Sequence, residues 1–201
     1  KKGDIAFAPA LDSFQLKSHA VDLRLGFTFL IPKRWHTTAN GREAIRIDHF
    51  HKDKKAYFDV IELEQGQHFE LLPGEYVSVN TLESVKIPND LMAVLYPRSS
   101  TNRRGLSVDL TGIIDSGYEG QLTIPIRNNT TSQAITLYPG ERFCQIVFEE
   151  LAGAVETEKS RYHKKDIIEG FIPYNTSSDE KEIEYLMKGD IKKLKSENPI
   201  A

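Results

Sequence analysis

Short runs of alternating apolar and polar residues, separated by turns that contain glycine and proline, occupy the chain from Ile5 to Glu150. A period of two residues is typical of β-strands that bury one face, because successive side chains on a strand point to opposite sides. The pattern predicts strands at Val21–Leu30, Tyr57–Leu63, His68–Leu72, Tyr76–Thr81, Leu91–Tyr96, Leu106–Asp115, Gln121–Asn128, Ala134–Leu137 and Phe143–Glu149. Many short strands of this kind indicate an all-β sandwich or barrel.

Two proline–glycine turns have the same surroundings. Pro73-Gly74 and Pro139-Gly140 each follow an apolar residue and precede a glutamate. Turns of this type reverse the chain between antiparallel strands, since proline presets φ and glycine accepts a positive φ. The repeat favours a jelly-roll-like arrangement in which the two turns are equivalent corners.

Two segments depart from the strand pattern. Ile31–Lys55 lacks clear alternation, so we expect an insertion loop or a distorted hairpin there. In Asp179–Glu197 apolar residues recur every three or four positions, which predicts an amphipathic helix interrupted at Gly189. The sequence thus predicts a distorted jelly-roll or β-barrel domain over residues 1–155, and a C-terminal arm with a helical extension over residues 156–201.

Composition excludes several classes of function. Of the 201 residues 39% are hydrophobic and 27% are charged, and no stretch approaches the roughly 18 consecutive apolar residues of a membrane span. The 26 Lys and Arg against 29 Asp and Glu give a net charge of -3, so no broad basic surface is expected to bind nucleic acid. Cys144 is the only cysteine, which excludes an intrachain disulfide and fits a cytoplasmic protein.

Basic and hydroxyl side chains gather after one of the expected strands. Arg98, Ser99 and Ser100 follow Pro97, and Arg103 comes shortly after them. Arginine offers a planar fork of donors and serine a short hydroxyl donor, which together suit the oxygens of a polyphosphate. A turn of this composition also occurs as ordinary solvated surface, and the residues alone leave that alternative open.

A carboxylate and an aromatic ring come together in a later turn. Asp115 ends an apolar run, and Ser116-Gly117-Tyr118 lead into the next strand. On a rigid hairpin the carboxylate can orient or deprotonate a water, and Tyr118 can stack against a sugar or a base. In the alternative interpretation Asp115 only caps backbone amides in an Asx-type turn, and Tyr118 covers the edge of the core.

Four motifs resemble those of a known superfamily. They are residues 21–26 (Val-Asp-Leu-Arg-Leu-Gly), 97–103 (Pro-Arg-Ser-Ser, ending in Arg103), 112–120 (Gly-Ile-Ile-Asp-Ser-Gly-Tyr-Glu-Gly) and 139–145 (Pro-Gly-Glu-Arg-Phe-Cys-Gln). Their order and spacing are similar to those of the dUTPase and dCTP deaminase superfamily. The resemblance implies a homotrimer of jelly-roll-like subunits, in which neighbouring chains build each active site around a magnesium-bound deoxynucleoside triphosphate.

The same resemblance assigns roles around the phosphates. Ser99, Ser100 and Gln145 are implied to contact phosphate oxygens, with Arg98 and Arg103 supporting the site. Magnesium is implied to bind mainly through the substrate phosphates and water, with no direct protein ligand. Such a site needs no dense cage of carboxylates.

The resemblance also assigns roles around the sugar and the water. Asp115 is implied to bind the deoxyribose 3′-hydroxyl and to position the nucleophilic water. Tyr118 is implied to pack on the sugar and to disfavour a 2′-hydroxyl. Asp22, the acidic residue of the first motif, is implied to act near the metal or at a subunit contact.

Position 125 bears on the branch of the superfamily. Deaminases of this superfamily carry, on the strand after the hairpin, a glutamate that shuttles protons during attack on the cytosine C4, and alignment puts Pro125 there. Alternation places Pro125 on the face opposite the core. Proline has no ionisable group and no N–H, so the ordinary deaminase mechanism is expected to be missing. Glu119 and Asp109 remain candidates for a carboxylate that replaces the missing glutamate in proton transfer. In the alternative interpretation the proline only distorts the strand.

Together with the resemblance, the residues favour a magnesium-dependent diphosphatase that converts dUTP and water to dUMP and pyrophosphate. One alternative is a dCTP deaminase, or a bifunctional enzyme, that uses a displaced acid. Another is an inactive relative that senses nucleotides or binds a protein.

A basic and aromatic segment stands where dUTPases carry a glycine-rich closing arm. Arg161, Tyr162 and Lys164 of this segment are therefore candidates for a phosphate lid. A solvated run of charged residues is the alternative.

Overall fold

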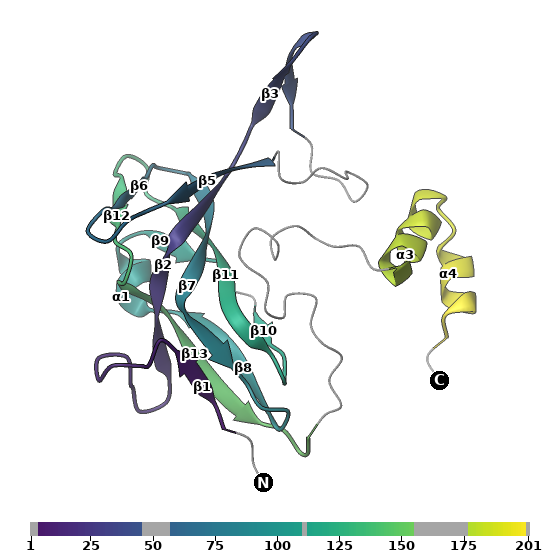
Figure 1. Cartoon of the computed structure of the whole chain (residues 1–201). Coiled ribbons are helices and arrows are strands. Elements are labelled where there is room, and N and C mark those ends of the chain that lie inside the picture. Colours follow the sequence, from purple (N-terminus) through teal and green to yellow (C-terminus); the bar gives the residue numbers. More distant parts are fainter. Residues whose placement is uncertain (1–3, 46–56, 110–111, 155–176, 200–201) are drawn as a thin grey trace.

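β-Strands dominate the part of the chain that this computed structural model describes, residues 4–45, 57–109, 112–154 and 177–199. The strands are β1 (Ala6–Ala8), β2 (Val21–Pro32), β3 (Trp35–Thr38), β4 (Gly41–Ala44), β5 (Phe58–Glu62), β6 (Phe69–Leu71), β7 (Tyr76–Lys86), β8 (Leu91–Pro97), β9 (Leu106–Val108), β10 (Ile113–Ile114), β11 (Glu119–Asn128), β12 (Ile135–Leu137) and β13 (Arg142–Glu150). The described helices are α1 (Ser99–Arg103), α3 (Ser177–Met187) and α4 (Ile191–Glu197). The predicted all-β body with a helical C-terminal extension is confirmed (Figure 1).

One curled antiparallel sheet forms the body (Figure 1). Its strands follow the order β10-β8-β13-β2-β7-β11-β9, while β1 pairs with β7 and β5 pairs with β2. Two smaller sheets join β12 to β6 and β3 to β4. The pairings are antiparallel throughout the described sheets, as the alternating pattern and the short turns predict.

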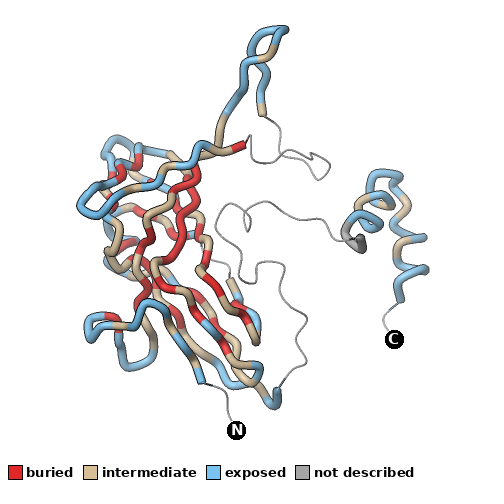
Figure 2. The backbone as a smooth tube through the Cα atoms, in the orientation of Figure 1, coloured by how far each residue is buried: buried red, intermediate tan, exposed pale blue. Residues whose placement is uncertain are grey.

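The core follows the central strands of the curled sheet (Figure 2). Leu25 and Phe29 of β2 are fully buried, as are Phe143 and Ile146 of β13. The ring of Phe29 stacks on Phe69, with the two centroids 4.5 Å apart. Full burial of each such side chain stabilises the fold by about 1.5–3 kcal/mol, so this core holds the strand ends at fixed positions.

Strand β11 has the predicted alternation. Leu122, Ile124 and Ile126 are buried, whereas Pro125 lies half-buried on the opposite face. The Asp109 N–H donates to the Pro125 carbonyl over 2.9 Å. Because proline has no N–H to donate in return, the ladder between β9 and β11 loses a hydrogen bond at this pair, which coincides with the end of β9.

The two proline–glycine turns are equivalent. Gly74 and Gly140 both adopt positive φ, 74° and 88°. In each turn the N–H of the glutamate, Glu75 or Glu141, donates over 3.0 Å to the carbonyl of the residue before the proline. The glutamate carboxylate in turn accepts from the N–H of that same residue. The repeated sequence therefore builds two turns with the same hydrogen bonds.

Some predicted strand bounds are wrong. The expected strand Leu106–Asp115 is two strands, β9 and β10, and residues 110–111 between them lie outside the described residues. β9 pairs with β11 at one end of the sheet order and β10 pairs with β8 at the other end, so one straight strand cannot make both pairings.

Two other segments also bear on the sequence predictions. Residues Ser99–Arg103 form the short helix α1 where the sequence indicated a turn. In the insertion Ile31–Lys55, β3 and β4 form a hairpin, which confirms that alternative; residues 46–56 lie outside the description.

The C-terminal helices end and restart around Gly189. Gly189 has a φ of 70°, and Asp190 begins α4 by accepting a hydrogen bond from the Lys193 N–H at 3.1 Å.

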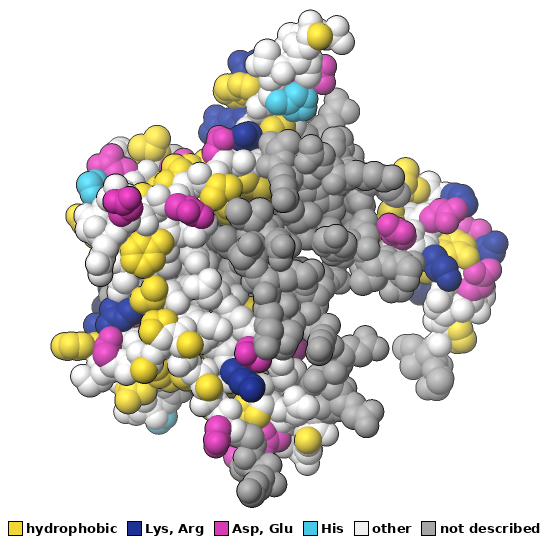
Figure 3. All heavy atoms as spheres, in the orientation of Figure 1, with side chains coloured by type: hydrophobic (Ala, Val, Ile, Leu, Met, Phe, Trp, Pro, Cys, Tyr) yellow, Lys and Arg dark blue, Asp and Glu magenta, His cyan; other side chains and the backbone are white. Residues whose placement is uncertain are grey.

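Across the described residues, the helices are too short or too polar to cross a membrane. On the face that Figure 3 shows, basic and acidic side chains are interspersed, in keeping with the nearly balanced charge of the sequence.

Candidate functional site

A pocket of about 440 Å³ opens where β2, β8 and β13 approach α1. The residues that line it, called the arginine pocket from here on, are Arg24, Arg98, Ser100, Thr101, Arg104, Glu141 and Arg142. Four of these seven side chains are arginines and one is acidic. Such a lining suits an anion with several oxygens, because guanidinium groups donate in planar forks.

Strand register brings the arginines together. Arg142, the first residue of β13, pairs with Arg24 of β2. On the other side of β13, Arg98 follows the last residue of β8, and its N–H donates to the Phe143 carbonyl over 3.3 Å. Because β8 and β13 are antiparallel, the end of one lies beside the start of the other. Residues from three distant parts of the sequence thus meet at one edge.

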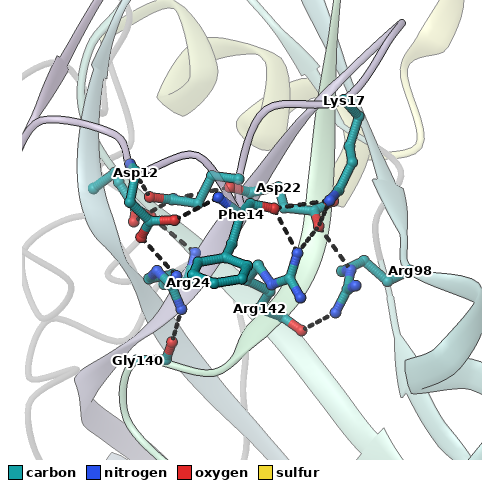
Figure 4. A network of polar contacts seen from close by, with 10 residues as sticks. Asp12, Phe14, Lys17, Asp22, Arg24, Arg98, Gly140 and Arg142 are labelled. Carbon is teal, nitrogen blue, oxygen red and sulfur yellow. Dashed lines mark hydrogen bonds and ion pairs between the residues drawn. The ribbon is translucent and has the colours of Figure 1, made fainter.

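Asp22 lies among the basic side chains beside the arginine pocket (Figure 4). Its side chain is almost fully buried. Its Oδ2 accepts a hydrogen bond from Arg142 Nη1 at 3.2 Å and forms an ion pair with Arg98 Nε at 3.1 Å. Lys17 Nζ lies 3.9 Å from the same oxygen. Three positive groups around one carboxylate repel a further cation. These contacts therefore do not favour the role near the metal that the resemblance implies for Asp22.

The other two arginines also have acidic partners. Arg24 Nη2 donates to Asp12 Oδ2 over 2.6 Å, and Arg24 Nη1 donates to the Gly140 carbonyl over 2.6 Å. The hydrogen bond from Arg24 lowers the pKa of the Asp12 carboxyl. Arg104 Nη2 lies 3.1 Å from Glu141 Oε2. Acidic partners therefore offset much of the positive charge of the pocket.

The predicted phosphate contacts lie near this pocket to different degrees. Arg98 and Ser100 line it, while Ser99 and Arg103 are exposed residues of α1 outside the lining. Gln145 is half-buried on β13, and its Nε2 donates to the Pro97 carbonyl over 3.4 Å.

Sequence reasoning missed three of the pocket arginines. Arg24 and Arg142 stand inside motifs that the sequence already singled out, but neither was assigned a role there. Arg104 was passed over in favour of its neighbour Arg103. The sequence signal for them was the presence of arginine in three separate motifs. The pairing of β2 with β13 brings two of these motifs together at the pocket.

The second candidate element is the turn formed by residues 115–118, called the Asp115 turn. The Tyr118 N–H donates to the Asp115 carbonyl over 3.1 Å, and Gly117 adopts a φ of 76°. Asp115 is exposed, and its carboxylate has no hydrogen-bond or ion-pair partner among the residues described. The turn is thus closed by the backbone, which leaves the carboxylate available to a ligand.

Tyr118 belongs to the core in the single chain. It is 7% exposed, and its hydroxyl donates to the Gln121 carbonyl over 2.7 Å. Burial raises the pKa of Tyr118 to about 12. These contacts match the interpretation in which Tyr118 covers the edge of the core, and they fix the base of the Asp115 turn.

One chain does not bring the Asp115 turn to the arginine pocket. Ile114 pairs with Ala93, and the antiparallel register carries Asp115 further from Pro97, where β8 reaches the pocket. At about 3.3 Å per residue, the five positions from Met92 to Pro97 correspond to about 16 Å of strand.

Direct metal ligands are scarce in the described residues, which hold no cluster of three or more His, Cys, Asp or Glu suited to a metal ion. Near the arginine pocket the carboxylates of Asp12, Asp22 and Glu141 already bind arginines. The lid candidates Arg161, Tyr162 and Lys164 lie outside the described residues.

Comparison with known proteins gives a consistent family match. A family model described as dCTP deaminase-like matches residues 1–151. The chain is 40% identical over 152 residues to "dCTP deaminase, dUMP-forming" of Dictyoglomus thermophilum, covering 75% of this chain and 73% of that relative. It is 36% identical over 157 residues to "dCTP deaminase" of Natronomonas pharaonis, covering 77% of each.

A solved structure has the same fold. The 2'-deoxycytidine 5'-triphosphate deaminase from Agrobacterium tumefaciens superposes with a TM-score of 0.54 at 24% identity. The match covers 72% of this chain and 43% of that longer chain. This likeness extends to the fold of the β body.

Proposed function

Because the chain belongs to the dCTP deaminase-like family, we propose that it hydrolyses dUTP to dUMP and pyrophosphate as a homotrimer with shared active sites. The observation that carries the proposal is the arginine pocket, whose donors suit a chain of phosphates. For hydrolysis the protein mainly has to orient a water and supply hydrogen-bond donors to the phosphate oxygens.

The substrate is the magnesium complex of the nucleotide. The carboxylates near the pocket are already bound to arginines, so the described residues offer few free ligands there for a resident ion. Magnesium supplies neutralisation of the phosphate charge when it arrives with the substrate. The partial neutralisation of the pocket arginines by Asp12, Asp22 and Glu141 fits a ligand that carries its own cation.

The chain's own residues then divide the work. Ser100, Arg98 and Arg142 bind phosphate oxygens in the pocket. Asp115 orients a water and takes its proton as the water replaces pyrophosphate at the α-phosphate, so that dUTP and water give dUMP and pyrophosphate. Because the Asp115 turn and the pocket are far apart in one chain, the carboxylate at each pocket comes from a second copy.

Pro125 supports hydrolysis over deamination. Loss of ammonia from a cytosine requires a group that moves a proton to the leaving amine, since the neutral amine leaves poorly. Proline at this position on β11 has nothing to donate or accept with its side chain. Hydrolysis of the phosphate chain does not depend on that position.

The names of the relatives favour a second candidate, formation of dUMP from dCTP. That reaction requires a carboxylate near position 125. Asp109 is the better candidate of the two considered, because its N–H bonds to the Pro125 carbonyl and the antiparallel register puts both side chains on one face. Glu119 lies six residues away along β11, about 20 Å of strand.

Two incubations separate these functions. The purified protein with magnesium is given dUTP or dCTP, and pyrophosphate and ammonia are assayed. The proposal expects pyrophosphate from dUTP and no ammonia from dCTP. Ammonia from dCTP would support the second candidate and direct attention to Asp109, and no product from either nucleotide would favour a relative that senses nucleotides without turnover.

A further inference from the structure

The carboxylate of Asp22 holds two pocket arginines through one oxygen. Asp22 Oδ2 forms an ion pair with Arg98 Nε at 3.1 Å and accepts a hydrogen bond from Arg142 Nη1 at 3.2 Å (Figure 4). The two arginines also bond to each other, since Arg98 Nη1 donates to the Arg142 carbonyl over 2.8 Å. Arg142 Nη1 is held further by the Phe14 carbonyl at 2.5 Å. The position of one guanidinium is therefore tied to that of the other.

These contacts leave part of each guanidinium group for a ligand. Arg98 uses Nε and Nη1, and Arg142 uses Nη1 alone. Within the described part of the chain, Arg98 Nη2 and the Nε and Nη2 of Arg142 have no protein partner. Both side chains line the arginine pocket beside Ser100. Their remaining donors therefore belong to the same anion site.

Burial makes a purely stabilising role a weak explanation for Asp22. Taking the Asp22 carboxylate out of water, and the two guanidinium groups partly out of it, has a desolvation cost, and ion pairs with a buried partner often add little net stability for that reason. What such a pair does supply is geometry. A group that is oriented before the ligand arrives binds more tightly, because less freedom is lost on binding.

We propose that Asp22 is a positioning residue, which holds Arg98 and Arg142 so that their free donors meet the same phosphate chain. This inference rests on the proposed function, because it takes the arginine pocket as the phosphate site. It assigns Asp22 neither to the metal nor to a subunit contact. The residue acts through the two arginines without touching the ligand itself.

The first experiment replaces the charge and keeps the shape. In Asp22→Asn we expect the KM for dUTP and the Kd for inorganic pyrophosphate to rise about tenfold or more, the usual scale for residues that orient ligand-binding groups. The chain should still fold, which circular dichroism and thermal melting check. Asp59→Asn is the matched control, because it removes the acidic partner of Lys33, an ion pair of 2.9 Å outside the pocket, and should leave both constants unchanged.

A double-mutant cycle tests whether Asp22 acts through an arginine. Arg142→Lys keeps a positive charge but loses the planar fork. In that background Asp22→Asn should weaken pyrophosphate binding by a smaller factor than in the unaltered chain, because part of the effect has already been removed. Equal factors in both backgrounds, or an unchanged Kd in Asp22→Asn with only a lower melting temperature, would overturn the inference.

A measurement on the unaltered chain covers the case in which Asp22→Asn does not fold. Nuclear magnetic resonance of the guanidinium groups should show hindered rotation for Arg98 and Arg142 before pyrophosphate is added. Freely rotating guanidinium groups in the unligated protein would contradict positioning.

The inference and the proposed reaction fail separately. Tight pyrophosphate binding that depends on Asp22 without any turnover of dUTP would sink the proposed reaction and leave positioning intact. Turnover of dUTP with a KM and a pyrophosphate Kd that are unchanged in Asp22→Asn would overturn positioning and leave the proposed reaction intact. An unaltered chain that does not bind pyrophosphate would count against positioning at a phosphate site.

Discussion

The arginine pocket and the Asp115 turn differ in how far a single chain satisfies their charged groups. In the pocket Arg98 and Arg142 are held by the buried Asp22, and Arg24 by Asp12. In the turn, Asp115 is exposed, and its carboxylate has no partner among the described residues. Groups that are satisfied within the chain are oriented before a ligand arrives, whereas an exposed carboxylate takes its orientation from what it meets.

The difference suggests a division between folding and assembly. The antiparallel pairing of β2, β8 and β13 builds the arginine pocket, the proposed phosphate site, within one chain. The Asp115 turn lies at the far end of β8, and in the proposed function it reaches a pocket only on a second copy. The following predictions test that division.

The largest effect is expected at Asp115. Asp115→Asn should lower the rate of pyrophosphate release from dUTP by at least about 10²-fold, the scale usual for loss of a general base. The melting temperature should stay unchanged, because the turn is closed by backbone groups. Asp90→Asn, in another turn of the body, is the control, and near-normal turnover in folded Asp115→Asn would reduce Asp115 to a turn residue.

Mixing two inactive variants tests whether the halves come from different chains. Asp115→Asn keeps the pocket, and Arg142→Gln keeps the carboxylate. After unfolding and refolding together at equal amounts, random assembly should restore about a quarter of the unaltered activity, because a site works when each half comes from the chain that retains it. Activity that stays at the level of the separate variants, with mixed oligomers shown by mass spectrometry, would mean that each chain builds its own site.

A smaller effect is expected inside the pocket. Ser100→Ala removes one neutral donor and should raise the KM for dUTP about fivefold, in line with a net hydrogen bond of about 1 kcal/mol. The value of kcat and the melting temperature should change little, since Ser100 is exposed. Asn102→Ala is the matched control on α1, as its side chain is exposed and lies outside the pocket lining. Equal effects of the two changes would argue against the pocket as the phosphate site.

The smallest effect on turnover at neutral pH is expected at Tyr118, whose buried side chain lies at the base of the Asp115 turn. Burial raises the pKa of Tyr118 from 10.0 to about 12 in the folded chain. The stability that this neutral phenol contributes is complete below pH 10 and is lost as the pH rises towards 12, because only the unfolded chain ionises in that range. The loss corresponds to about 2–3 kcal/mol.

Denaturant unfolding across this pH range measures that contribution. Tyr118→Phe should remove this part of the fall in stability between pH 10 and 12 and keep near-normal turnover at pH 7. An equally steep fall in both proteins would show that other groups cause the alkaline loss of stability.

Local sequence was sufficient to predict much of the fold. Alternation predicted the buried face of β11 and placed Pro125 opposite it, because a strand sends neighbouring side chains to opposite sides whatever its partners are. The two proline–glycine turns were equally predictable, since their hydrogen bonds lie within four residues. The break at Gly189 follows from the same kind of local rule.

Local sequence was less informative about the candidate site. Arg98 and Ser100 stood out because they lie together in the chain, and the structure places both in the pocket lining. Arg24 and Arg142 are more than a hundred positions apart, and nothing in either neighbourhood indicates that β2 pairs with β13 at that register. The pairing results from burial of side chains along both strands, which is a property of the whole sheet.

By itself, then, the sequence determined most of the strands, the two proline–glycine turns and the chemical character of the candidate residues, because each depends on a few neighbouring positions. Only the tertiary structure decided that β9 and β10 pair at opposite ends of the sheet order, and that Asp22 faces two arginines. It also decided that the Asp115 turn lies away from the arginine pocket. These outcomes depend on which distant strands pair and in which register, and that choice is made by the packing of the complete core.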